Sequence, residues 1–196
     1  VPAASTAKPV AYNKEKMQER DITVGADDFK LPGTLTLPVG KKKAPVVILV
    51  HGSGPQDRDE TVGPNKPFRD LAWGLERGIA TVRYDKRTKV YGAACVPEGR
   101  NIDYDTESVD DAVAIIAWAK ELPEVDADSV YVLGHSLGAT LAPRIAEQAD
   151  GLTGIILVAA LARPFEDAIV EQMTYISSLT DSSANAKKQI TEIKKQ

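Results

Sequence analysis

Cysteine and histidine are scarce in this 196-residue sequence, and their scarcity excludes most metal sites. Cys95 is the only cysteine, so the chain forms no internal disulfide and no cysteine-ligated zinc or iron–sulfur site. The two histidines, His51 and His135, are too few for a histidine-rich metal site. We therefore expect no bound metal.

Excess positive charge and long apolar runs are also lacking. Lys and Arg number 24 against 28 Asp and Glu, which leaves a net charge of −4 and no basic surface for a phosphate backbone. The longest apolar runs, at 46–50 and 154–162, are far shorter than the about 20 residues that span a bilayer. We expect neither a nucleic-acid partner nor a membrane span.

The sequence does contain enough apolar residues for one sizeable core. Hydrophobic residues make up 43% of the chain and charged residues 27%, a balance typical of a folded domain. Because residue 1 is Val rather than Met, we expect that an upstream tag or targeting peptide has been removed. The location in the cell is left open, with a secreted or periplasmic bacterial location favoured.

Hydrophobic periodicity predicts strands that alternate with helices. Alternating apolar residues between Arg20 and Leu37 indicate an antiparallel hairpin. Short apolar runs, typical of strands covered on both faces, follow at 46–50, 79–84, 129–133 and 154–160. Helical patterns lie between and after them, at 68–75, 106–122 with Thr106 as cap, 137–148, 165–179 and 184–195. This order predicts an α/β fold with a mostly parallel sheet.

The residues Gly134-His135-Ser136-Leu137-Gly138 stand between a predicted strand and a predicted helix. A serine on such a sharp turn adopts a strained backbone that lifts its hydroxyl above the sheet, and the glycines let strand and helix approach closely. The helix also directs its unpaired amides toward the serine. We predict that Ser136 is a catalytic nucleophile, and the alternative is that Ser136 only caps the helix.

A second glycine-rich turn, His51-Gly52-Ser53-Gly54-Pro55, follows the strand predicted at 46–50. Its glycines let the chain turn so that the Ser53 amide points across the sheet end toward Ser136. Together with the Leu137 amide, this gives two donors for a tetrahedral oxyanion. The alternatives are an ordinary turn or a phosphate-binding loop. The second is disfavoured because neither the lysine nor the G-x-G-x-x-G spacing of such loops follows.

Charged residues crowd behind two predicted strands. Residues 56–59 follow the glycine-rich turn, and residues 85–87 follow the strand at 79–84. They lie outside the carboxyl ends of the strands, where ligands bind in such sheets. They either hold the loop by ion pairs or bind substrate, and the mixture of opposite charges favours support. Cys95, in a segment of glycine and alanine, is interpreted as a structural or spectator thiol.

These segments resemble the α/β-hydrolase superfamily, and more closely the bacterial serine hydrolases related to acyl-peptidases and to cinnamoyl or acetyl esterases. The resemblance rests on VVILVHGSGPQDRDE, TVRYDKR, the helical pattern at 110–118, VLGHSLGA and ILVAALARPFED, which look like the N-terminal two-thirds of such a domain. It implies acyl transfer from an ester or amide with serine as the nucleophile and without a cofactor. It also implies helical lid material after residue 160.

The sequence departs from this family in its histidines. The family order is serine, then Asp or Glu, then histidine, and no histidine follows Ser136. We interpret His51 and His135 as buried structural residues, with the His135 side chain turned away. No triad acid is assigned, because the carboxylates after the serine fall in the expected lid helices: Glu166, Asp167, Glu171 and Asp181. We expect the acid and histidine in a remaining C-terminal part of the same protein, either continuous with this chain or as a separate chain.

The sequence as a whole predicts three regions and one activity. The regions are an N-terminal tether at 1–19, an α/β-hydrolase core at 20–163 that is incomplete at its C-terminal end, and the start of a helical lid at 164–196. The activity is hydrolysis of small carboxylic esters, such as short-chain acyl or aryl esters, through an acyl-enzyme on Ser136. The alternatives are a non-catalytic, hydrolase-like binding module and an acyl-peptidase.

Overall fold

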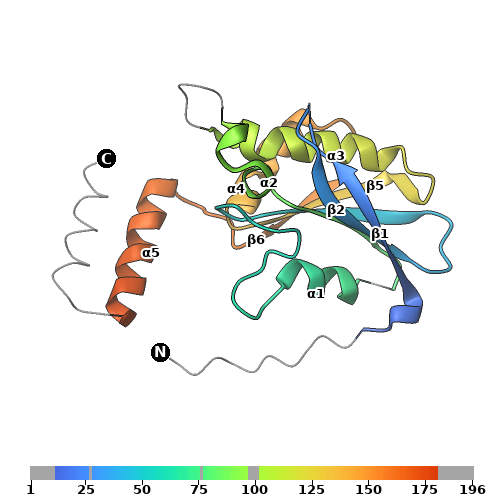
Figure 1. Cartoon of the computed structure of the whole chain (residues 1–196), viewed down its shortest axis with the longest axis horizontal. Coiled ribbons are helices and arrows are strands. Elements are labelled where there is room, and N and C mark those ends of the chain that lie inside the picture. Colours follow the sequence, from blue (N-terminus) through green and yellow to red (C-terminus); the bar gives the residue numbers. More distant parts are fainter. Residues whose placement is uncertain (1–11, 27, 76, 97–101, 181–196) are drawn as a thin grey trace. The chain divides into compact units, whose positions relative to one another are not determined.

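The computed structural model describes residues 12–26, 28–75, 77–96 and 102–180. The chain forms two units: Val10–Ala160 contains the whole sheet, and Leu161–Gln196 belongs to the other. In the first unit the described strands form one mixed sheet in the order β1-β2-β4-β3-β5-β6 (Figure 1). Their bounds are β1 (Met17–Val24), β2 (Leu31–Pro38), β3 (Ala44–Val50), β4 (Ala80–Tyr84), β5 (Val125–His135) and β6 (Gly154–Val158).

The first two strands form the predicted antiparallel hairpin. Ile22 of β1 faces Gly33 of β2, and β2 in turn pairs antiparallel with β4. Leu31 and Leu35 of β2 are buried, and so are Thr34 and Thr36, so β2 is covered on both faces instead of on one as the alternation predicts. The hairpin therefore covers one edge of the parallel part of the sheet.

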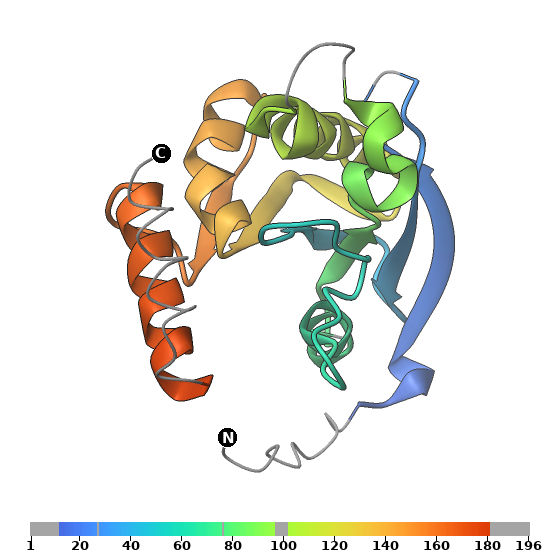
Figure 2. The same cartoon turned by 60° about the vertical axis from the view of Figure 1, so that its left-hand side comes forward.

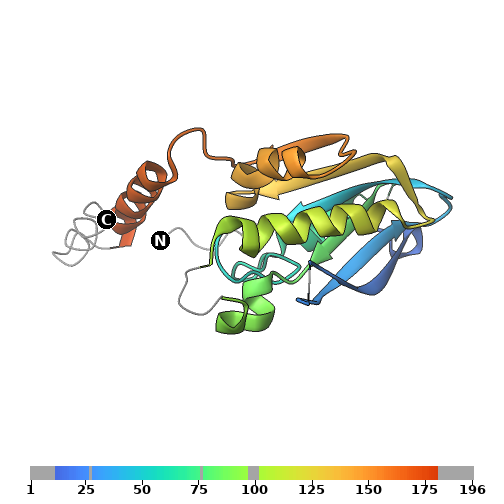
Figure 3. The ribbon, with the colours of Figure 1, turned by 90° about the horizontal axis from the view of Figure 1, so that it is seen from above.

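The remaining strands are parallel and mostly buried. β4, β3, β5 and β6 run in the same direction, and Val46, Ile48 and Leu49 of β3 are fully buried. Helices cover both faces: α1 (Pro67–Gly74) lies on one, and α3 (Asp110–Lys120) and α4 (Leu137–Gln148) lie on the other (Figure 1 and Figure 2). Figure 3, seen from above, shows α3 and α4 in front of the sheet. The predicted α/β fold is confirmed.

Some local features differ from the sequence-based expectation. The helix predicted from 106 begins with a π-helical turn, Asp105–Val109, before α3. Thr106 does not cap this helix, because a capping side chain accepts a hydrogen bond from an amide two or three residues later. Instead, Asp103 Oδ1 accepts from the Thr106 N–H at 2.8 Å. The segment around Cys95 forms a short helix and a 3-10 turn, α2 (Arg87–Tyr91) and Gly92–Cys95. The helix predicted at 184–195 lies outside the described residues.

Exposed apolar side chains occur in both units. β6 stands at the edge of the described sheet, and its Ile156, Leu157 and Val158 are all exposed. In the second unit, α5 (Phe165–Thr180) confirms the helix predicted at 165–179 and exposes Met173 and Ile176. None of the helices in the described part of the chain has the length and apolar character needed to cross a membrane.

Candidate active site

Ser136 lies at the junction of β5 and α4, where the chain reverses sharply. Its φ is 53° and its ψ is −114°, and within the described chain only two other non-glycine residues, Glu60 and Ala159, have a positive φ. Such a conformation costs roughly 1–3 kcal/mol and persists only where the surroundings enforce it. The Ser136 N–H donates to the Val158 carbonyl of β6 at 2.9 Å. The serine side chain makes no capping hydrogen bond, so the capping-only interpretation is wrong.

The glycines on either side of Ser136 allow α4 to approach the sheet. A Cβ atom on Gly138 would lie 2.6 Å from the His51 carbonyl oxygen, and one on Gly134 would lie 2.5 Å from the Ala139 nitrogen. Real Cβ atoms essentially never approach other atoms closer than 3.0 Å. Both positions therefore require glycine, for the packing reason that the motif predicts.

The glycine-rich turn after β3 lies beside Ser136. β3 and β5 are neighbouring parallel strands, so their carboxyl ends meet at the same edge of the sheet. The Cβ position of Gly52 is 3.3 Å from Ser136 Cβ. Ser53 follows and is exposed, and Gly54 turns the chain with a φ of 84°. The structure thus brings together the two turns singled out in the sequence.

Leu137 directly follows the serine, and Ser53 directly follows Gly52. Leu137 is the first residue of α4, and its side chain is buried. The first amides of a helix have no partner inside the helix and carry the positive end of its dipole. Among the backbone hydrogen bonds of loops and caps in the described residues, none has the Leu137 or the Ser53 N–H as donor. The N-terminus of α4 therefore favours negative charge close to Ser136.

The loop behind the glycine-rich turn is anchored by its own charged side chains. Asp57 Oδ1 accepts from the N–H groups of Asp59 and Thr61 at 3.1 and 3.0 Å. The Arg58 guanidinium pairs with both carboxylate oxygens of Asp85, at 3.2 and 2.9 Å. Arg58 thereby ties this loop to the end of β4.

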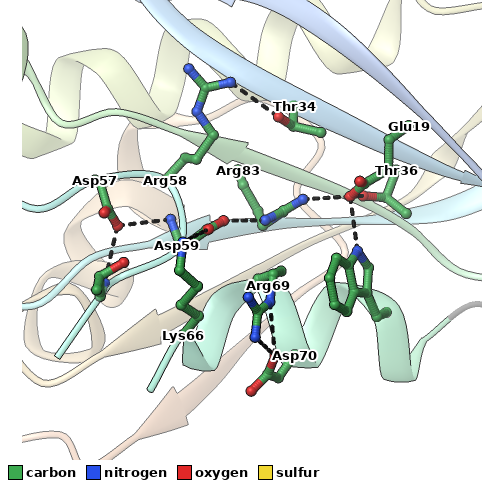
Figure 4. Close-up of polar contacts among 12 residues, drawn as sticks. Glu19, Thr34, Thr36, Asp57, Arg58, Asp59, Lys66, Arg69, Asp70 and Arg83 are labelled. Carbon is green, nitrogen blue, oxygen red and sulfur yellow. Dashed lines mark hydrogen bonds and ion pairs between the residues drawn. The ribbon is translucent and has the colours of Figure 1, made fainter. Parts of the chain in front are cut away.

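Arg83 of β4 also holds this loop in place. Its guanidinium is 3% exposed and forms ion pairs with Asp59 and Glu19 (Figure 4). Lys66 Nζ donates to the second oxygen of Asp59 at 2.9 Å. These charged residues hold the loop, as the mixture of opposite charges predicts.

Glu60 connects the turn to the residue before the serine. Its side chain is 2% exposed, and its Oε1 accepts from the Gly52 N–H at 2.7 Å. The same oxygen lies 2.9 Å from His135 Nδ1. The expectation that His135 is buried is therefore wrong, because its side chain is 39% exposed. His135 ends β5, beyond the covered interior of the sheet, and the Glu60 carboxylate holds its ring at the turn.

Lys86 and Arg87 are buried behind the same turn. Lys86 Nζ donates to the Gly52 carbonyl at 3.1 Å and lies 3.3 Å from Glu107 Oε2. Burial lowers the pKa of Lys86, while the Glu107 carboxylate raises it. Arg87 forms a bidentate pair with Asp111 at 2.9 and 2.8 Å. Both cations are 2% exposed and paired with carboxylates, so they support the structure behind the turn.

His51 is buried, as the sequence predicts. Its ring packs between Phe68 and Tyr84, with centroids 5.3 and 5.0 Å away. Burial, with the Lys86 charge second, lowers the pKa of His51 to about 3, so the ring is neutral at pH 7. In the described structure, no hydrogen bond joins Ser136 Oγ to His51 or to His135.

The burial of His51 predicts that acid destabilises the fold. Between pH 6.5 and about 3 the unfolded chain binds a proton that the folded chain does not, so the free energy of unfolding falls as pH falls. From pH 7 to pH 5 this one group costs about 2 kcal/mol. Urea unfolding at pH 7 and pH 5 should show that the free energy of unfolding of His51→Gln falls by about 2 kcal/mol less than that of the wild-type protein. Equal pH dependence in the two proteins would contradict the assignment.

Glu60 is the site residue that sequence reasoning does not single out, and Lys86 is predicted only as one of several loop supports. Both stand in charged runs that directly follow glycine-rich or buried segments, which is the available signal. Nothing in the local sequence indicates that both side chains contact one glycine.

Comparison with known proteins places this geometry in a family. The chain matches the alpha/beta hydrolase family over residues 47–186. It is 43% identical over 172 residues to Esterase EstD of Thermotoga maritima, a match that covers 87% of this chain and 39% of that protein. The chain thus spans about two fifths of the length of this curated relative.

Solved structures have the same fold. Acetyl xylan esterase 1 from Thermoanaerobacterium is similar with a TM-score of 0.58 and 16% identity, over 93% of this chain and 63% of that one. Acylaminoacyl peptidase from Pyrococcus horikoshii is similar with a TM-score of 0.56 and 19% identity, over 75% of this chain and 23% of that one. With the sheet order and the strained serine turn, the family match over residues 47–186 establishes that this chain belongs to the alpha/beta hydrolase family.

Proposed function

We propose that this protein is a serine ester hydrolase in which Ser136 is the nucleophile and the Ser53 and Leu137 amides bind the oxyanion. The observation that carries the proposal is the left-handed Ser136, enclosed by two obligatory glycines and placed beside the glycine-rich turn. The 43% identity to Esterase EstD supports ester hydrolysis over the other reactions that this fold serves.

The proposed reaction is two acyl transfers. Ser136 Oγ forms a bond to the acyl carbon while its proton passes to a general base, and the carbonyl oxygen becomes an oxyanion held by the two amides. Collapse of this intermediate breaks the ester bond, and the alcohol leaves with the proton. Water then attacks the acyl-enzyme by the same route and releases the acid.

The general base is proposed to be a histidine outside residues 1–196, accompanied by a triad acid. His51 is buried and neutral, and its pKa of about 3 is too low for proton abstraction near pH 7. His135 Nδ1 is already engaged by Glu60. A C-terminal part of the same protein, continuous or separate, is the proposed source of both groups. The exposed apolar edge strand β6 supports this arrangement, because such edges pair readily with further strands.

The proposed substrates are small esters with an apolar acyl or aryl group. Residues from 164 onward are proposed as the start of a lid, and α5 exposes Met173 and Ile176 about one turn apart. Apolar lid side chains favour apolar acyl groups. We expect a higher kcat/KM for butyryl or cinnamoyl esters than for esters of charged acids, and a screen with the reverse order would remove this substrate class.

A fluorophosphonate probe tests the nucleophile in the full-length protein. The expected result is one covalent adduct, located at Ser136 by peptide mass spectrometry, and no adduct in Ser136→Ala. A folded protein that is not labelled, and that turns over no short-chain aryl ester, would favour the non-catalytic binding module instead.

A further inference from the structure

Two buried charged side chains hold the two polar backbone groups of Gly52. Glu60 Oε1 accepts from the Gly52 N–H at 2.7 Å, and Lys86 Nζ donates to the Gly52 carbonyl at 3.1 Å. Both residues are 2% exposed. The main chain adds a further link, because the Lys86 N–H donates to the Gln56 carbonyl at 3.0 Å. The turn is therefore fixed from both sides by groups that water does not screen.

Stability alone does not explain such an arrangement. Removing an ammonium group from water is costly, and a buried ion pair is often no more stable than well-packed apolar side chains. Lys86 needs Glu107 as a counter-ion, and Glu107 is held in turn by the Thr88 hydroxyl, which donates to its Oε1 at 3.0 Å. Glu107 and Thr88 thus help to keep the Lys86 ammonium against the Gly52 carbonyl oxygen.

The peptide bond that Lys86 contacts is the one whose other end is the Ser53 N–H. None of the described peptide bonds is cis, so the Gly52 carbonyl and the Ser53 N–H point in opposite directions in one rigid plane. A cation on the carbonyl oxygen fixes that plane. It also draws electron density from the nitrogen, which makes the N–H a stronger donor.

We propose that Lys86 is a positioning residue for catalysis: through the Gly52–Ser53 peptide bond it orients and polarises the Ser53 N–H toward the oxyanion, while Glu60 holds the opposite side of Gly52. This inference rests on the proposed function, because it assigns how the Ser53 donor of that reaction is activated. It goes beyond loop support, since the effect of Lys86 is realised only when negative charge develops on the substrate oxygen.

Lys86→Met in the full-length protein tests the inference, because it keeps the length of the side chain and removes the cation. The matched control is Lys66→Met, which removes a partly exposed cation that pairs with Asp59 (Figure 4) and not with Gly52. The measurements are kcat and KM for a butyryl aryl ester and Ki for an alkyl trifluoromethyl ketone. The oxygen of Ser136 adds to the carbonyl carbon of the ketone, and the carbonyl oxygen becomes an oxyanion in the site.

The expected result is selective. Lys86→Met should lower kcat about tenfold or more and raise Ki in parallel, with KM changed less than about twofold, because removing a whole oxyanion donor costs about 100-fold or more. Lys66→Met should leave all three close to wild type. If Lys86→Met does not fold, Lys86→Gln, which keeps a neutral donor, is measured in the same way and should again raise the ratio of Ki to KM.

A variant at Lys86 that is active and has the wild-type ratio of Ki to KM would overturn the positioning role, whatever its thermal stability. This outcome is distinct from failure of the proposed function. In that case the wild-type protein itself would hydrolyse no ester and Ser136 would not react with the fluorophosphonate.

Discussion

Ser136→Ala in the full-length protein is expected to lower kcat/KM for a short-chain aryl ester by at least about a thousandfold, with the fold retained. In the proposed mechanism no acyl-enzyme forms without this hydroxyl, and only the oxyanion donors and substrate binding then contribute to the rate. Stopped-flow and steady-state assays with the same ester measure the loss. Near-wild-type turnover in Ser136→Ala would show that another group is the nucleophile.

Ser136→Gly separates the chemistry of the serine from its backbone strain. Glycine and alanine both lack the hydroxyl, so both variants should be inactive, but only glycine adopts a φ of 53° without steric cost. We expect the free energy of unfolding of Ser136→Gly to be about 1 kcal/mol higher than that of Ser136→Ala. Urea unfolding measures the difference. Equal stabilities would show that the turn imposes little strain on residue 136.

Most of the fold follows from patterns that depend on nearest neighbours in sequence. The apolar run at 46–50 predicts β3 because a strand covered on both faces has no polar alternation. Hairpin alternation predicts β1 and β2 for the same local reason. The start of α3 was less predictable, since Thr106 and Asp103 are both good capping residues and only the path of the preceding loop decides between them.

The site residues also differ in how far the local sequence predicts them. Ser136 and its glycines are predictable because a tight strand-to-helix turn has few sequence solutions. Glu60 and Lys86 are not, because their common partner Gly52 is 8 residues from one and 34 from the other. The path of the loop after β3 brings Glu60 to Gly52, and the pairing of β3 with β4 brings Lys86 there. The exposure of His135 is unpredictable for a related reason: its neighbour Glu60 is 75 residues away in sequence, so nothing local indicates a polar partner.

Gly138→Ala is expected to cause the largest loss of stability among these variants. A Cβ atom at this position would lie 2.6 Å from the His51 carbonyl oxygen, and the end of β3 cannot move away without breaking its pairing with β5. Relief therefore requires α4 to shift off the sheet. We expect a loss of more than about 4 kcal/mol in the free energy of unfolding, or no folded protein, because backbone clashes in a core belong to the most damaging class of substitution.

Two other glycines serve as matched controls for this prediction. Gly74 ends α1 with nothing within 4 Å of its Cβ position, so Gly74→Ala should be neutral or stabilise by up to about 1 kcal/mol through helix propensity. Gly54 has equally free space but a φ of 84°, so Gly54→Ala should cost about 1–2 kcal/mol from backbone strain alone. Urea unfolding of the three variants thus separates clash from strain. If Gly138→Ala were no less stable than Gly54→Ala, the close approach of α4 to β3 that positions the Leu137 amide would be wrong.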